Sequence, residues 1–218
     1  MIPVIDERSK RILEFIEPRP KDKILIIGTG VFPKIEWFLF KKFNCKSIIS
    51  TDIDEKNLIN GKKVLPELEF KKIDAERKFP FPERNFDKVI FTEVLEHLKD
   101  DVGALNTIHR LLKKGGHLII SVPNKDLRHV INPVKYFEHE RHYSNEDIIE
   151  KLRGAGFGIE HFNVVESFSL LANLYLHIIM KFLLRKNVPF NFFDRHHNKT
   201  YAQYNRHGLD IILKARKI

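Results

Sequence analysis

The chain has 218 residues, of which 43% are hydrophobic and 31% charged, with a formal net charge of +9; this composition is ordinary for a globular protein with one substantial core. Its single cysteine, Cys45, excludes intrachain disulfides and cysteine-built zinc sites. No apolar stretch reaches the roughly 20 residues of a membrane-spanning helix, and the charged N-terminus lacks a signal-peptide core, so we expect a cytoplasmic location.

Helical and strand patterns alternate along most of the chain. In chain order we predict helix 8–17, strand 23–27, helix 34–43, strand 47–51, helix 55–64, strand 68–73, strand 86–91, helix 101–113, strand 117–122, helix 144–154, strand 157–165 and strand 208–215. Gly115 and Gly116 are expected to close the fourth helix, and Ser144 with Asp147 to cap the fifth. The alternation predicts one α/β domain, 1–218, with a doubly wound, mostly parallel seven-stranded sheet.

Residues 166–206 interrupt this alternation and are predicted to form a helical insertion before the last strand. Their first part, 167–180, contains no formal charge and is apolar nearly all round, so it must be buried somewhere. It could be a lid over the substrate, a homodimer interface or a contact with a membrane surface. Three basic residues extend this segment to 186 and would suit anionic lipid headgroups: Lys181, Arg185 and Lys186.

The positive charge is concentrated near the C-terminus. Residues 181–218 hold nine Lys or Arg and two Asp, a net charge of +7. Such an asymmetry suggests an anionic partner, which could be a phosphorylated substrate, a membrane surface or RNA. The alternative is a solvated basic face without a specific partner.

Three predicted strands end in residues typical of nucleotide binding. The turn Gly28-Thr29-Gly30 follows the first strand, Asp52 the second and Asp74-Ala75 the third. In open α/β sheets, ligands bind at the carboxyl ends of the strands, where glycines let the backbone approach and a carboxylate accepts ribose hydroxyls. Asp52 could instead cap helix 55–64. The three strand ends together indicate a nucleotide-type cofactor.

Six sequence runs resemble successive motifs of the class I S-adenosylmethionine-dependent methyltransferases. They are ILIIGTG, IISTDID, KKIDAE, FPFPERNFDKVIFTEVLEHLKD, LLKKGGHLIISVPN and HERHYSNEDIIEKLRGAGF, within about residues 8–165. The chain is most similar to the small-molecule branch that includes quinone-biosynthesis O-methyltransferases. The resemblance implies a Rossmann-like transferase with S-adenosyl-L-methionine as its cofactor.

The resemblance also implies roles for individual residues. Gly28, Thr29 and Gly30 would form the turn under the methionine moiety, and Asp52 would hold the ribose. The remaining cofactor contacts would come from residues after the second, third and fourth strands: Ile53, Asp74, Ala75, Glu93 and Val94. Two positions depart from the family pattern, because Ile26 stands where an acid is usual and Phe32 where a small residue is usual.

Methyl transfer needs a positioned acceptor and, for a hydroxyl acceptor, a base. The candidate catalytic residues are His97, His139 and His142; Arg141 and Tyr143 are candidate substrate contacts. The alternative for each histidine is a structural role. A metal site is not expected.

The resulting hypothesis is an enzyme that methylates a small apolar or anionic acceptor, preferably at oxygen. One alternative is an RNA or protein methyltransferase that uses the basic C-terminal segment, although no RNA-binding module is recognisable. Another is a cofactor-binding or membrane-associated partner without catalysis. Peripheral membrane contact through 167–186 is compatible with the first hypothesis.

Overall fold

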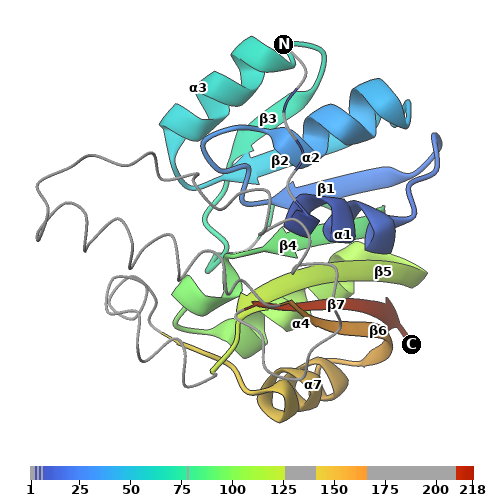
Figure 1. Ribbon diagram of the computed structural model, residues 1–218, viewed down its shortest axis with the longest axis vertical. Helices are drawn as coiled ribbons and strands as arrows, with labels where there is room; N and C mark the ends of the chain where they lie inside the picture. Colours follow the sequence, from blue (N-terminus) through green and yellow to red (C-terminus); the bar gives the residue numbers. More distant parts are fainter. Residues whose placement is uncertain (1–2, 4, 6, 78, 126–140, 166–209) are drawn as a thin grey trace, which may run out of the picture.

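The computed structural model describes residues 3, 5, 7–77, 79–125, 141–165 and 210–218 (Figure 1). Within these ranges, seven strands form one sheet in the order β3-β2-β1-β4-β5-β7-β6. The strands are β1 (Lys23–Ile27), β2 (Ser47–Asp52), β3 (Glu69–Lys72), β4 (Phe86–Thr92), β5 (Leu112–Pro123), β6 (Phe157–Val165) and β7 (Asp210–Lys217). β7 runs antiparallel to β5 and β6, and the other pairs are parallel. The predicted doubly wound, mostly parallel sheet is confirmed.

Helices cover both faces of this sheet. They are α1 (Glu7–Ile16), α2 (Lys34–Trp37) with its π-helical continuation η1 (Phe38–Lys42), α3 (Glu55–Val64), the short η2 (Leu95–His97), α4 (Asp101–Leu111) and α7 (Asn145–Gly154). In β1, Leu25 and Ile27 belong to the core under α4 and α7, while Ile24 and Ile26 belong to the core under α1 and η1. Strand β1 is therefore apolar along its length because both of its faces are covered.

Two helix ends test the helix boundaries predicted from the sequence. Ser144 and Asp147 form the expected capping box of α7, with Asp147 N donating to Ser144 Oγ at 3.1 Å and Ser144 N to Asp147 Oδ2 at 3.2 Å. The prediction for the fourth helix is wrong, because α4 ends at Leu111 and the chain enters β5 directly. Gly115, at φ +73°, lies inside β5 where its register with β4 shifts. A glycine at positive φ serves a strand irregularity as readily as a helix end.

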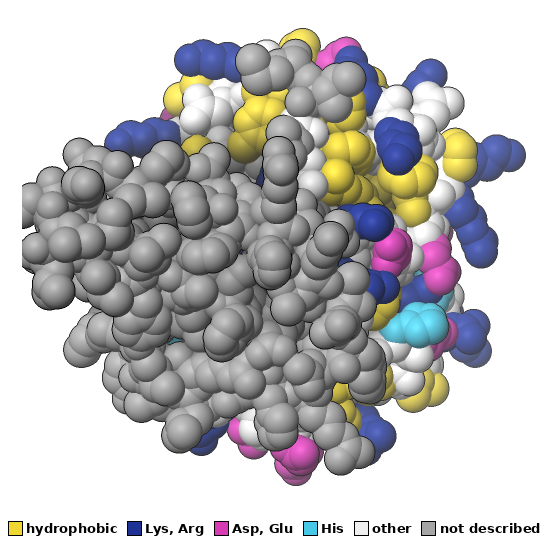
Figure 2. Space-filling view, in the orientation of Figure 1, with side chains coloured by type: hydrophobic (Ala, Val, Ile, Leu, Met, Phe, Trp, Pro, Cys, Tyr) yellow, Lys and Arg dark blue, Asp and Glu magenta, His cyan; other side chains and the backbone are white. Residues whose placement is uncertain are grey.

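The predicted insertion 166–206 lies outside the described residues, so its roles as lid, interface or lipid contact stay predictions. The same holds for the single-domain organisation of 1–218. No helix in the described ranges is long and apolar enough to cross a membrane. On the face shown in Figure 2, the described Lys and Arg side chains are spread around the surface and alternate with hydrophobic and acidic ones.

Candidate functional site

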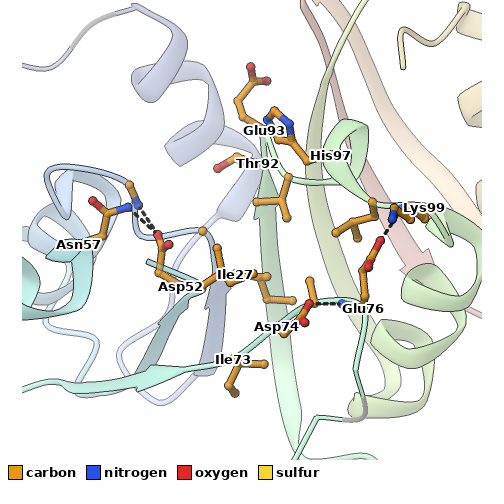
Figure 3. Close-up of a pocket in the computed structure, with 16 residues that line it drawn as sticks. Ile27, Asp52, Asn57, Ile73, Asp74, Glu76, Thr92, Glu93, His97 and Lys99 are labelled. Atoms are coloured by element: carbon orange, nitrogen blue, oxygen red, sulfur yellow. Dashed lines mark hydrogen bonds between the residues drawn. The ribbon is translucent and has the colours of Figure 1, made fainter. Parts of the chain in front are cut away.

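A pocket of about 500 Å³ lies at the carboxyl ends of β1 to β4 (Figure 3). Strand order reverses here, since β2 and β4 flank β1 on opposite sides. This is the switch point at which open α/β sheets bind their ligands. The pocket is lined by residues from four strand ends: Ile27, Gly28, Gly30, Asp52, Ile53, Asn57, Ile73, Asp74, Ala75, Glu76, Thr92, Glu93, Val94, His97, Leu98 and Lys99.

The floor beside β1 is the glycine turn. Gly28 (φ +91°) and Gly30 (φ +67°) adopt backbone conformations that L side chains rarely adopt. A Cβ on Gly28 would lie 2.6 Å from Val94 Cγ2, whereas the space beside Gly30 is open. The amides of Gly28 and Thr29 both donate to Thr51 O, at 2.8 and 3.1 Å. The turn is thus attached to β2 and leaves room for a ligand over Gly30.

Asp52, at the end of β2, forms the left wall of the pocket in Figure 3. Its carboxylate accepts hydrogen bonds from Gly30 N at 2.9 Å, Asp54 N at 2.8 Å and Asn57 Nδ2 at 3.2 Å. The N-cap of α3 is Asp54, which accepts from Lys56 N at 2.9 Å, so Asp52 does not cap the helix. Because a carboxylate has about four acceptor positions, Asp52 retains capacity for a ligand hydroxyl.

The end of β3 supplies an apolar and acidic wall. Asp74 accepts from Glu76 N at 3.0 Å, and Glu76 accepts from Lys99 N at 2.5 Å, which joins this loop to the segment after β4. At the end of the neighbouring strand β2, Ile53 leaves 64% of its surface exposed. An exposed isoleucine next to strand-end carboxylates suits a flat ring with polar edges, such as adenine.

At the end of β4, Glu93 has φ +56°, a conformation that costs an ordinary residue about 1–2 kcal/mol. Side chains from distant segments hold it there. Its carboxylate accepts from Ser121 Oγ at 3.0 Å and pairs with Arg8 Nη2 of α1 at 2.5 Å. Its amide donates to Ser121 O at 3.1 Å. A strained residue held this firmly beside a pocket indicates a functional position.

Behind Glu93 lies a second acid, Glu96, whose side chain is fully buried. Neither of its carboxylate oxygens has a hydrogen-bond partner in the part of the chain that the structure describes. Burial, with the neighbouring charge of Glu93, raises the pKa of Glu96 to about 8. His97 follows it and lines the pocket with 47% of its side chain exposed, its Nε2 lying 4.0 Å from Glu96 Oε1. His97 therefore faces the pocket.

Eight of the nine predicted cofactor residues line the pocket; Thr29 does not, because its hydroxyl is buried against Ser50. Arg141 and Tyr143 also lie away from the described lining. Tyr143 Oη donates to Asp101 Oδ2 at 3.0 Å, and Arg141 Nη2 to Lys99 O at 2.7 Å. They brace the rim through these contacts, and direct contact with an acceptor stays a prediction.

The remaining candidates give mixed outcomes. His142 is described but is not among the residues that line the pocket, and His139 lies outside the described ranges. No group of three His, Cys, Asp or Glu side chains suited to a metal occurs within the described ranges. Ile26, which stands where an acid is usual in the family, is buried in the core against α1 and η1. Phe32 is 42% exposed and leaves the glycine turn open.

Sequence reasoning missed several residues of this site. Asn57 carries a local signal, since it lies five residues beyond Asp52, in the first turn of α3, and donates to the Asp52 carboxylate. Glu96 also carried one, as the second acid in the run before His97. Arg8 gave none, because its contact with Ser121 spans 113 positions of the chain.

Known proteins with related sequences carry methyltransferase domains. The family described as "Methyltransferase domain" matches residues 25–120. A protein of Mycolicibacterium smegmatis described as an S-adenosylmethionine-dependent methyltransferase is 26% identical over 120 residues, 53% of this chain and 45% of that protein. A ubiquinone biosynthesis O-methyltransferase of Alkalilimnicola ehrlichii is 37% identical over 60 residues, 28% of this chain and 24% of that protein. The matches thus span less than half of either curated relative.

Solved structures extend the similarity of fold beyond that match. A geranyl diphosphate methyltransferase in complex with S-adenosylmethionine superimposes with a TM-score of 0.71 over 97% of this chain and 84% of that one, at 14% identity. At this identity the likeness concerns the fold.

Proposed function

We propose that this chain, a class I S-adenosylmethionine-dependent methyltransferase by its domain and fold, transfers the methyl group of S-adenosyl-L-methionine to a small acceptor. The observation that carries the proposal is Asp52. This carboxylate stands beside the open glycine turn, keeps one acceptor position and lines a pocket at the switch point of the sheet.

The pocket fits the two ends of such a cofactor. Asp52 would accept a hydrogen bond from a ribose hydroxyl, and Ile53 would pack against the adenine ring. Asp74, with Ala75, would meet the adenine amino group at the lower end of Figure 3. Gly28 and Gly30 would pass under the methionine moiety, since nothing lies within 4 Å of a Cβ built on Gly30.

When bound, S-adenosylmethionine supplies a methyl group already activated on a sulfonium. The chain itself has to orient the acceptor, exclude water and remove a proton. Glu93 and His97 lie at the upper end of the pocket, opposite Asp74 in Figure 3. His97 would accept the proton of an acceptor hydroxyl, because histidine is the side chain most often used as a general base and this one is exposed to the pocket.

The acceptor we favour is a small apolar or anionic molecule methylated at oxygen. Support comes from the local similarity to a ubiquinone biosynthesis O-methyltransferase and from the apolar lining by Ile27, Val94 and Leu98. The predicted apolar segment 167–186 would add a lid or a peripheral lipid contact, and an apolar acceptor is compatible with either.

Calorimetric titration with S-adenosylhomocysteine tests the cofactor site. We expect binding by the unmodified protein and about 10- to 100-fold weaker binding by Asp52→Ala, because one charge-assisted hydrogen bond is worth about 1.5–3 kcal/mol. Asp54→Ala is the matched control, since it removes the same charge two residues away and Asp54 does not line the described pocket. Equal affinity of the unmodified protein and Asp52→Ala would exclude the proposed ribose contact.

A transfer assay with labelled S-adenosylmethionine tests the acceptor class. Quinone-like phenols and lipids should accept the label, and His97→Ala should lower the turnover number more than the affinity for the acceptor. Labelling of RNA or protein in place of phenols would contradict the small-molecule proposal and leave the cofactor site intact.

A further inference from the structure

Glu36 is an acid in an unusual place. It lies in α2, the helix that follows the glycine turn, where an acidic residue would ordinarily face water. In this fold the residue is only 1% exposed. It lies against the end of β2, directly behind the turn that carries Gly28 and Gly30. A buried carboxyl needs partners, so its contacts identify what it does.

A chain of hydroxyl groups connects Glu36 to the turn. Glu36 Oε1 lies 2.6 Å from Ser50 Oγ, and Ser50 Oγ lies 2.7 Å from Thr29 Oγ1. Thr29 Oγ1 in turn lies 3.3 Å from Thr51 O, the carbonyl that also accepts the amides of Gly28 and Thr29. Glu36, Ser50 and Thr29 thus form a chain of three buried side chains that links α2 to the glycine turn.

The charge of Glu36 changes in the neutral range. Burial is the largest influence and raises the pKa of Glu36 to about 7, against the stabilising hydrogen bond from Ser50. The charged group that faces it is Asp52 at the end of β2, whose negative charge raises this pKa further. Glu36 is therefore coupled to the carboxylate proposed to bind the ribose.

Proton counting links this charge to the direction of the hydroxyl chain. A carbonyl only accepts, so a hydroxyl of Thr29 that donates to Thr51 O must itself accept from Ser50. Ser50, which donates to Glu36 Oε1 when the acid is ionised, would then have to accept from Glu36, and this requires the protonated acid. Ionised Glu36 can only accept, which turns the hydroxyls of Ser50 and Thr29 toward it and breaks the bond to Thr51 O. One proton therefore selects between two hydrogen-bond arrangements under the turn.

We propose that Glu36 is a positioning residue of the cofactor site, which holds the Gly28–Gly30 turn through Ser50 and Thr29. The identity of the ligand in this inference rests on the proposed function. The support of the turn by Glu36 can be tested on the protein without ligand. The neutral acid allows all three contacts of the hydroxyl chain to be hydrogen bonds at the same time. The ionised acid removes one hydrogen bond and places a second negative charge near Asp52.

The test compares Glu36→Gln, Ser50→Ala and the surface control Glu67→Gln with the unmodified protein. An amide donates to Ser50 as the protonated acid does, so glutamine imitates the neutral state. S-adenosylhomocysteine binding is titrated by calorimetry from about pH 6 to about pH 8.5, a range that spans the titration of Glu36. Hydrogen exchange of the Gly28 and Thr29 amides is measured on the protein without ligand.

Unmodified protein and Glu67→Gln should lose about three- to tenfold in affinity across this range, the worth of about one hydrogen bond. Glu36→Gln should match their affinity near pH 6 and show a smaller loss above it. Ser50→Ala should bind more weakly at every pH and exchange its turn amides faster, because the chain of hydroxyls is cut.

An affinity profile of Glu36→Gln that follows the unmodified protein, or turn amides unchanged by Ser50→Ala, would overturn the proposal and leave Glu36 as a core residue. If no variant binds the ligand, hydrogen exchange of the Gly28 and Thr29 amides still tests whether Glu36 supports the turn. Faster exchange in Ser50→Ala, and amide protection factors that fall with pH in the unmodified protein but not in Glu36→Gln, would support the positioning role while the proposed function fails.

Discussion

Charged side chains are paired differently at the amino and carboxyl ends of the central strands. At the amino end, buried Lys88 donates to Asp22 at 2.7 Å and to Glu17 O at 2.5 Å, and Lys113 pairs with Asp87 at 2.7 Å. Burial acts to raise the pKa of Asp87, but hydrogen bonds from Lys113 and the Lys23 amide hold it below its usual range. Each of these charges is matched by an opposite charge or a dipole.

The carboxyl end instead holds buried acids with raised pKa values. Burial raises the pKa values of Glu36 and Glu96 to about 7 and 8. Such features reduce stability and persist where a site needs preformed geometry and poised protons. The comparison indicates that the amino end supports the fold, while the carboxyl end carries the chemistry at some expense of stability.

The largest effect should come from Gly28→Ala at the carboxyl end. The alanine would have to keep φ +91°, and its Cβ would meet Val94 Cγ2 at 2.6 Å. We therefore expect a loss of about 3 kcal/mol in the free energy of unfolding. Binding of S-adenosylhomocysteine should become undetectable. Urea denaturation and calorimetry measure the two effects. Gly154→Ala is the control, since no atom lies within 4 Å of its Cβ, and it should bind normally.

At the amino end, Lys88→Met should lower the free energy of unfolding by about 2–4 kcal/mol, because it leaves Asp22 without its cation. Ligand affinity should not change. Lys113→Met removes a half-exposed cation from the same end and should cost less than about 1 kcal/mol. A weakened ligand affinity in Lys88→Met would refute the division of roles between the two ends.

Glu96→Gln should produce a pH-dependent gain in stability. The folded pKa of about 8 exceeds the ordinary value of 4.5, so the folded protein holds this proton more tightly and loses stability as pH rises through that window. Glutamine removes the loss. The free energies of unfolding should converge as the pH falls below about 4.5 and favour the variant by about 5 kcal/mol above pH 8, the free-energy equivalent of this pKa shift. A constant difference across the range would contradict the raised pKa.

The smallest effect concerns a helix end remote from the pocket. Asp147→Ala breaks one half of the α7 capping box and should lower the free energy of unfolding by about 1 kcal/mol without altering ligand affinity. Glu146→Ala is the matched control, because it removes an acid from the same first turn and leaves the two box hydrogen bonds in place. Urea denaturation distinguishes the two variants.

Much of the fold could be predicted because its signals are local and regular. A strand is indicated by the apolar run Ile24–Ile27. The glycine turn and two acids lie at the ends of the first three strands, and parallel strands bring these ends to one edge of the sheet. The capping box of α7 is likewise contained within four residues. Gly115 and Gly116 misled the prediction because glycine permits a helix end and a strand irregularity equally.

By itself, the sequence determined the alternation of strands and helices, the turn at Gly28–Gly30 and the carboxylate at Asp52, because each depends on neighbouring residues and backbone geometry. Only the tertiary structure decided that Arg8 holds Glu93, that Glu96 is buried behind His97 and that Glu36 supports the turn. Whether an acid is solvated or buried depends on elements brought together from far along the chain, and its pKa follows from that packing.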